Sequence, residues 1–331
     1  MVSDARWRQR IAAVGIVVAM PVAGVALAEP ASGDIVRSTA AHVDRIDEVS
    51  DRELTMYVYS AAMDRVVRLD VIRPADASGP RPVLYLLNGA GGGEDAATWQ
   101  QQTDVREFFD DKDVNVVIPV GGAYSYYTDW QQDDQVLGRQ RWTTFLTEEL
   151  PPVLDQALGT SGRNAIAGMS MSGGSALALA ADAPDLYQAV AAYSGCAQTS
   201  SEPGQNYVEL VVHLGGGDVE NMWGPVGGPE WIARDVTLNA EKLRGKALYI
   251  SSGGGLPGPH EFSSAPNPVD YAVLGTIEAA VSQCNERLRN TLDGLGIEAT
   301  YDLRPDGTHS WGYWQDALHD SWPMIAAAIG G

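Results

Sequence analysis

Positive charge, cysteine and histidine are scarce in this sequence of 331 residues. It has 22 Lys and Arg against 43 Asp and Glu, which leaves a formal net charge of −21. A surface of that sign repels phosphate backbones, so we expect no nucleic-acid partner. The chain has only two Cys and five His, and neither a Cys-x-x-Cys nor a His-x-x-x-His pair occurs. The sequence therefore predicts no metal site and no cofactor.

Long apolar runs are equally rare. One run follows three arginines among the first ten residues, extends from Ile11 to Ala28 and ends in Ala26-Leu27-Ala28. This pattern is typical of a secretory signal, so we expect a signal peptide over residues 1–28 and a protein that is secreted or held at the cell envelope. A retained membrane anchor is the alternative; no later segment is long enough to span a bilayer. Residues 29–50 lack hydrophobic periodicity and are predicted to be a flexible leader.

The two cysteines are Cys196 and Cys284. After export both would enter an oxidising compartment, where disulfides form and persist. The sequence therefore predicts a Cys196–Cys284 bond, with two separate buried thiols as the alternative.

Strand-like and helix-like stretches alternate along the rest of the chain. Several strand-like stretches are apolar throughout, as buried parallel strands are. Residues 51–331 are predicted to form a single α/β-hydrolase domain, a mostly parallel sheet covered by helices on both faces. A stretch rich in Gly, Pro and Trp, from Ala197 to Asn239, is expected to be an insertion that shapes a substrate pocket. The expected strands are 54–60, 66–72, 83–87, 114–119, 165–167, 189–193, 247–250 and 299–303, and the expected helices are 142–158, 172–181, 271–292 and 314–328.

The segment from Asn164 to Ser175 runs from an apolar strand through small residues into an alanine-rich stretch. A serine nucleophile at the carboxyl edge of a sheet needs such a turn, because small neighbours let its hydroxyl stand clear. The usual Gly-x-Ser-x-Gly is here Gly168-Met169-Ser170-Met171-Ser172, with serine in place of the last glycine. Ser170 is the predicted nucleophile, and an ordinary strand-to-helix turn is the alternative.

A serine hydroxyl at neutral pH needs a histidine to take its proton. His309 stands in a loop just beyond the last expected strand, where an α/β-hydrolase carries its base, and the other histidines lack that placement. A carboxylate between Ser170 and His309 in the chain must then orient the imidazole. Four candidates remain open at this point: Asp235, Glu261, Asp270 and Glu278.

An oxyanion hole needs two backbone N–H groups directed at the developing negative charge. The residue after the nucleophile, Met171, supplies one of them. The glycine-rich segment Asn88 to Gly93 follows an apolar strand, and its glycines let the backbone approach a substrate, which nominates Ala90 for the other. A phosphate loop would use similar glycines, but the Lys-Ser/Thr pair that follows them is absent.

These residues also resemble a known family, the mycolyltransferases of the antigen 85 type with their corynebacterial relatives, in the α/β-hydrolase superfamily. The resemblance covers most of the chain from about Leu54 onward and depends on five segments in the same order. They are Tyr127-Thr128-Asp129-Trp130, Trp142 to Pro151, Gly168 to Met171, Met222 to Pro225, and Gly307 to Trp314.

The resemblance implies a serine, histidine and glutamate triad, and the family's glutamate falls on Glu278. The family also carries an aspartate and an arginine that bind the sugar, and the matching positions here are Asn88 and Gly91. We therefore expect trehalose to be a weaker acceptor than in antigen 85 proteins. The residues expected to bind substrate are Asn88, Asp129, Trp130, Ser310 and Trp311.

The family moves a mycolic acyl group from trehalose monomycolate to another trehalose ester or to cell-wall arabinogalactan, and some corynebacterial members acylate proteins. The resemblance thus implies an exported acyltransferase with this glycolipid donor and a trehalose ester, polysaccharide or protein as acceptor. A secreted carboxylesterase would share every catalytic residue and differ in letting water take the acyl group. A cell-wall or matrix-binding relative without chemistry is the third possibility.

Overall fold

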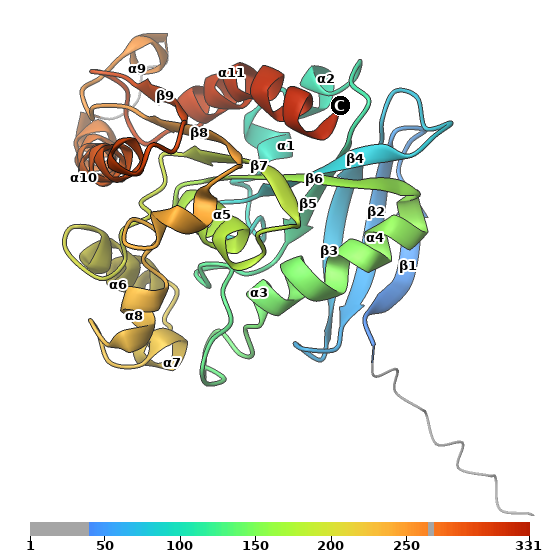
Figure 1. Ribbon diagram of the computed structural model, residues 1–331, viewed down its shortest axis with the longest axis horizontal. Helices are drawn as coiled ribbons and strands as arrows, with labels where there is room; N and C mark the ends of the chain where they lie inside the picture. Colours follow the sequence, from blue (N-terminus) through green and yellow to red (C-terminus); the bar gives the residue numbers. More distant parts are fainter. Residues whose placement is uncertain (1–39, 264–267) are drawn as a thin grey trace, which may run out of the picture. The chain divides into compact units, whose positions relative to one another are not determined.

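A nine-stranded sheet runs through the part of the chain that the computed structural model describes, residues 40–263 and 268–331 (Figure 1). Its strand order is β1-β2-β3-β5-β4-β6-β7-β8-β9. The pairs from β1 to β5 are antiparallel, and the pairs from β5 through β4 to β9 are parallel. This mostly parallel sheet confirms the predicted fold class. The strands are β1 His42–Glu48, β2 Glu53–Ser60, β3 Arg65–Ile72, β4 Arg81–Leu87, β5 Asn115–Val120, β6 Thr160–Met169, β7 Tyr187–Tyr193, β8 Ala247–Ser252 and β9 Thr300–Leu303.

Helices cover both faces of the sheet (Figure 1). One face packs against α3, α4, α5 and the insertion helices α6 to α8, together with the second half of α10. The other face packs against α1, α2 and α11. The helices are α1 Trp99–Gln102, α2 Val105–Phe108, α3 Trp142–Thr144, α4 Leu150–Leu158, α5 Met171–Asp182, α6 Gly204–Leu214, α7 Val219–Trp223, α8 Pro229–Ala233, α9 Pro259–Ser263, α10 Pro268–Leu295 and α11 Trp311–Ile329, with a 3-10 turn at Ala240–Leu243.

The central strands are apolar throughout because both of their faces are buried. In β4, Val83, Tyr85 and Leu87 belong to one hydrophobic cluster, while Leu84 and Leu86 belong to the cluster on the opposite face. Successive side chains of a strand point to opposite sides, so a doubly covered strand needs apolar residues at every position. The apolar runs that indicated parallel strands therefore arise because helices cover both faces of these strands.

The leader predicted over residues 29–50 is wrong for residues 42–48, which form β1. This strand pairs antiparallel with β2, and most of its side chains are exposed. An edge strand is held by backbone hydrogen bonds, and charged residues on it discourage pairing with other chains. Its sequence, HVDRIDE, consequently carries no apolar periodicity that would reveal it. Residues 29–39 and the expected signal peptide, 1–28, lie outside the described residues.

The single helix expected over residues 142–158 is divided by a π-helical turn, Phe145–Glu149, between α3 and α4. Pro151 and Pro152 follow one residue after the turn, and proline has no N–H to donate to the carbonyl four residues earlier. A wider turn at this point is one way in which a helix accommodates such a break.

The stretch from Ala197 to Asn239 forms the three helices α6, α7 and α8 and contains no strand, as expected of an insertion. In Figure 1 these helices lie together below α5. None of the helices within residues 40–263 and 268–331 has the length and apolarity to cross a membrane.

Candidate active site

Ser170 lies in the turn between β6 and α5, with φ of 57° and ψ of −124°. A positive φ is strained for a residue with a Cβ atom, and such strain gathers at functional sites. The turn is tight, because a Cβ atom on Gly168 would stand 2.5 Å from the carbonyl oxygen of Ser172. The Ser172 hydroxyl accepts from the Met169 N–H at 3.0 Å and lies 3.0 Å from the Met169 carbonyl oxygen. The serine that replaces the last glycine of the usual motif therefore closes this turn.

Ser170, His309 and Glu278 lie together at the carboxyl edge of the sheet. Nε2 of His309 is 2.7 Å from Oγ of Ser170, and Nδ1 is 2.7 Å from Oε2 of Glu278. His309 is 8% exposed, and Glu278 is fully buried. With Nδ1–H donating to the carboxylate, Nε2 is free to accept the serine proton.

The second oxygen of Glu278 is held by residues just beyond two strands. Oε1 accepts from the Ser194 hydroxyl at 2.7 Å and from the Gly253 N–H at 2.6 Å. Nε1 of Trp314 in turn donates to the Ser194 hydroxyl at 3.0 Å. A buried carboxylate is tolerated when donors surround it, and these donors also fix its direction toward His309.

Two of the other carboxylates considered as the acid have different tasks. Asp235 accepts from the N–H groups of Thr199 and Ser200, at 3.1 and 3.0 Å, and so ties the insertion together. Glu261 lies under the histidine loop without contacting the imidazole. The side chain of Asp270 lies outside the described residues.

Glu261 holds the residues on either side of His309. Its carboxylate accepts from the Thr308 hydroxyl at 2.6 Å, from the Tyr313 hydroxyl at 2.5 Å and from the Gly258 N–H at 2.7 Å. Burial opposes ionisation, but these hydrogen bonds outweigh it and lower the pKa of Glu261 below its usual 4.5. The loop that carries the imidazole is therefore fixed by a charged group beneath it.

A disulfide joins Cys196 to Cys284, with a Cα–Cα distance of 5.3 Å. Cys196 follows Ser194 by two residues, and Cys284 lies on α10, the helix that carries Glu278. The bond thus connects two segments that hold the acid. Across residues 40–263 and 268–331, no three His, Cys, Asp or Glu side chains are grouped to hold a metal ion, and the expectation of no metal stays a prediction.

The glycine-rich loop after β4 brings Ala90 to the nucleophile. A Cβ atom on Gly89 would lie 3.8 Å from Cβ of Ser170, so the loop passes directly beside it. The carbonyl of Ala90 accepts from the Tyr124 N–H at 2.7 Å, which anchors the loop. Within the described part of the chain, the backbone N–H groups of Ala90 and Met171 donate no hydrogen bond. Both predicted oxyanion donors are therefore available to a ligand.

Two of the residues expected to contact substrate are buried. Asn88 is 1% exposed, and its side-chain amide donates to the Pro119 carbonyl at 3.2 Å. Trp130 is also 1% exposed, and its indole N–H donates to the Ser125 carbonyl at 3.0 Å. Both side chains are enclosed by protein in this conformation, and their roles in substrate binding stay predictions.

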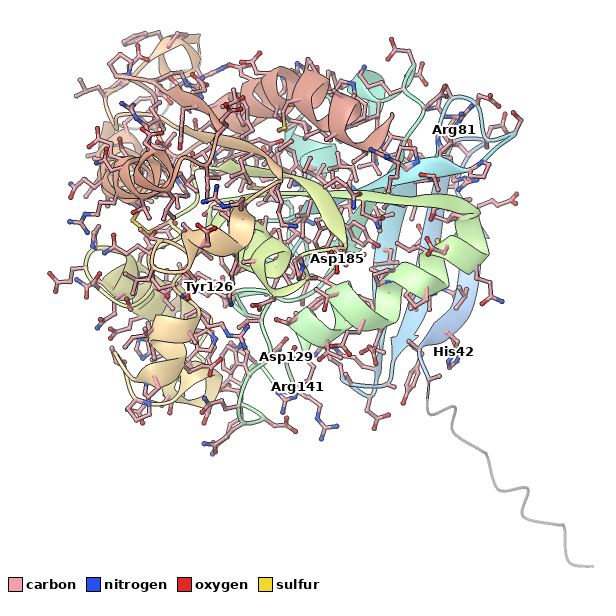
Figure 2. All side chains as sticks on the ribbon, in the orientation of Figure 1. His42, Arg81, Tyr126, Asp129, Arg141 and Asp185 are labelled. Carbon is pink, nitrogen blue, oxygen red and sulfur yellow. A yellow bond between two sulfur atoms is a disulfide. The ribbon has the colours of Figure 1, made fainter. Side chains whose placement is uncertain are left out.

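The other expected contacts have structural partners of their own. The carboxylate of Asp129 accepts from the N–H and the hydroxyl of Thr144, the last residue of α3, and the backbone of Asp129 pairs with that of Arg141 (Figure 2). Ser310 precedes α11, and its hydroxyl lies 3.3 Å from Oε1 of Glu261. Trp311 packs edge-on against Trp99 and Trp314, with ring centroids 5.6 and 5.1 Å apart. Their roles in substrate binding stay predictions.

Sequence reasoning missed one residue of the site, Tyr207. It lies on α6 in the insertion, and its hydroxyl is 3.3 Å from Oγ of Ser170 and 3.5 Å from Nε2 of His309. The insertion was expected to shape the pocket, but no local pattern distinguishes this tyrosine from the other twelve. The contact of Tyr207 with Ser170 and His309 depends on how α6 packs against the sheet, and local sequence does not predict that packing.

The fold and the site geometry are those of an α/β-hydrolase with a serine at the nucleophile position. The family model described as "Putative esterase" matches residues 60–325. Ag85B of Mycobacterium avium, a diacylglycerol acyltransferase/mycolyltransferase, is 31% identical over 283 residues, which cover 83% of each chain. Ag85A of Mycobacterium tuberculosis, of the same description, is 32% identical over 260 residues, which cover 75% of this chain and 74% of the relative. The chain therefore belongs to the antigen 85 mycolyltransferase family, within the esterase family.

Solved structures show the same fold. MPT51 (FbpC1) of Mycobacterium tuberculosis superposes with a TM-score of 0.72 at 27% identity, covering 85% of this chain and 100% of MPT51. A ferulic acid esterase superposes with a TM-score of 0.57 at 20% identity, covering 87% and 99% of the two chains, and supports the fold alone. Membership in this family supports an enzyme with hydrolase-like activity.

Proposed function

We propose that this protein is an exported acyltransferase that moves a mycoloyl group from trehalose monomycolate to a cell-envelope acceptor through an acyl-enzyme on Ser170. The observation that carries the proposal is the continuous hydrogen-bonded path from Ser170 through His309 to Glu278. Its members come from the turn after β6, from the loop after β9 and from α10, and such a path activates a serine for attack on an ester. The name of the antigen 85 relatives supports mycoloyl as the acyl group.

The proposed reaction has two half-reactions. In acylation, Oγ of Ser170 attacks the ester carbonyl while His309 takes its proton, and the amides of Ala90 and Met171 bind the oxyanion. His309 then gives the proton to the departing trehalose oxygen. In transfer, an acceptor hydroxyl gives its proton to His309 and displaces Ser170. The acceptor is a trehalose ester, an arabinan chain or a protein hydroxyl.

The test is mass spectrometry of the products that the purified protein makes from trehalose monomycolate, with and without an arabinan fragment. We expect a mycoloylated acceptor from the wild type and none from Ser170→Ala. Free mycolic acid as the main product from the wild type would identify a carboxylesterase instead.

A second measurement separates the enzyme from a binding protein. A fluorophosphonate probe labels an activated serine, so we expect labelling at Ser170 in the wild type and none in Ser170→Ala or His309→Ala. A folded wild type that takes up no label contradicts any acyl-enzyme mechanism.

A further inference from the structure

The hydroxyl of Tyr207 faces the two reacting groups of the site. It lies 3.3 Å from Oγ of Ser170 and 3.5 Å from Nε2 of His309, which are themselves 2.7 Å apart. The three polar atoms form a triangle, so a phenol oxygen occupies the space next to the serine–histidine hydrogen bond. In an acyl-enzyme mechanism the alcohol oxygen must come to this same neighbourhood, because it bonds to the acyl carbon on Oγ and exchanges a proton with Nε2.

The packing of α6 fixes the position of this phenol. Val208 and Val212 of the same helix are buried in the main hydrophobic cluster. The hydroxyl of Tyr126 donates to the Tyr207 carbonyl at 3.4 Å, so the segment after β5 supports α6 beside the site, where Figure 2 labels Tyr126. Tyr207 is thus held by several independent contacts.

The phenol is a hydrogen-bond donor at neutral pH. Burial is the largest influence and raises the pKa of Tyr207 above its usual 10.0, with a further rise from the charge of Glu278. The hydrogen bond with Ser170 opposes this rise without cancelling it. A protonated phenol can donate to an oxygen that is gaining negative charge.

We propose that the Tyr207 hydroxyl binds the alcohol oxygen of the reaction, the one that leaves during acylation and the one that enters during transfer. This assignment rests on the proposed acyl-enzyme mechanism and adds the residue that handles its alcohol. When the tetrahedral intermediate collapses, the bond from the acyl carbon to the alcohol oxygen breaks, and that oxygen takes the bonding electron pair. His309 supplies the proton that neutralises it, and Tyr207 donates a hydrogen bond to the same oxygen.

Transfer is the reverse of this step with a second alcohol. The acceptor hydroxyl loses its proton to Nε2 of His309, its oxygen bonds to the acyl carbon, and the bond to Oγ of Ser170 then breaks as Oγ regains the proton. Because both half-reactions pass through the same arrangement of groups, the contact with Tyr207 serves both.

The experiment compares two esters of one short-chain fatty acid, an ethyl ester and a 4-nitrophenyl ester, in wild type and Tyr207→Phe. An ethoxide needs stabilisation as it leaves, whereas a 4-nitrophenoxide leaves readily without it. We expect kcat/KM for acylation by the ethyl ester to fall about tenfold, the usual effect of losing one partly charged hydrogen bond, and that of the 4-nitrophenyl ester to change less than about twofold. The phenylalanine ring keeps the packing of α6.

The matched control is Tyr126→Phe, which removes the neighbouring phenol oxygen that supports the Tyr207 carbonyl. We expect it to affect both esters equally. If Tyr207→Phe slows the two esters by the same factor, or slows neither, the assignment is wrong, because a loss that does not depend on the leaving alcohol reflects the attack by Ser170 and not a contact with the alcohol oxygen. A wild type that cleaves neither ester contradicts the proposed function itself.

Discussion

Replacing Glu278 by glutamine tests whether its charge serves the imidazole. The substitution keeps the size of the side chain, so its oxygen can still accept from Ser194 and from the Gly253 N–H. Its amide nitrogen then faces Nδ1 of His309, where the carboxylate oxygen stood at 2.7 Å. An N–H at this place favours the tautomer with the proton on Nε2, which cannot accept a proton from Ser170.

The size of the effect follows from this geometry. During attack the imidazole becomes positively charged, and two opposite unit charges about 4 Å apart interact by roughly 4 kcal/mol at an effective dielectric constant of about 20. Losing that interaction slows the reaction by about 10³-fold, and the wrong tautomer adds to the loss, so we expect turnover to fall roughly 10³- to 10⁴-fold. The free energy of unfolding should fall by only about 1 to 2 kcal/mol, because two charge-assisted hydrogen bonds become neutral ones.

The assay is acylation of Ser170 by an activated ester, followed as the first turnover, together with urea unfolding of the same samples. The control is Glu261→Gln, the same change in a second buried carboxylate that contacts Thr308 and not the imidazole. We expect the control to retain at least about a tenth of the wild-type rate. If Glu278→Gln retains as much, or if the two variants are equally impaired, the charge of Glu278 does not act on His309.

Three further predictions concern stability. The double change Cys196→Ala and Cys284→Ala should lower the free energy of unfolding by about 2 to 4 kcal/mol in urea, since the bond closes a loop spanning 88 positions; equal stability would contradict the bond. Ser172→Gly restores the usual motif yet should cost about 1 kcal/mol, because the Met169 N–H loses its acceptor. The charge of Glu261 stabilises the fold above its usual pKa of 4.5, and that contribution disappears as the pH falls through its lowered pKa. The stability difference between wild type and Glu261→Gln should therefore be constant above about pH 5 and shrink in more acidic buffer, and a difference that grows there would refute the reasoning.

Much of the fold was predictable from local sequence because the central strands are doubly covered. Their apolar runs and the helical stretches between them each reveal one element, and all eight expected strands are present within a few residues. The edge strand β1 was not predicted because its side chains are mostly exposed and only its backbone is paired. The π-helical turn before Pro151 was not predicted because the apolar periodicity continues on either side of it.

The residues expected to bind substrate show what sequence resemblance leaves open. Trp130 lies in a segment that resembles the family and is of a residue type that stacks on sugars, while Asn88 stands where the family carries an aspartate. In this protein both are buried and bonded to backbone carbonyls. A motif identifies a segment, whereas the surrounding packing decides which of its side chains reach the pocket.

The sequence by itself determined the positions of Ser170 and His309, because each stands in a local pattern that its chemistry requires: a small-residue turn after a strand, and a loop after the last strand. Local patterns left four carboxylates open as the acid, the family resemblance pointed to Glu278 among them, and neither gave a sign of Tyr207. Only the tertiary structure shows the contact of Glu278 with His309 and that of Tyr207 with Ser170, since it brings α10 and α6 against loops from other parts of the chain. Contacts between side chains on different elements depend on how helices are placed on the sheet, and that placement results from the packing of the whole core.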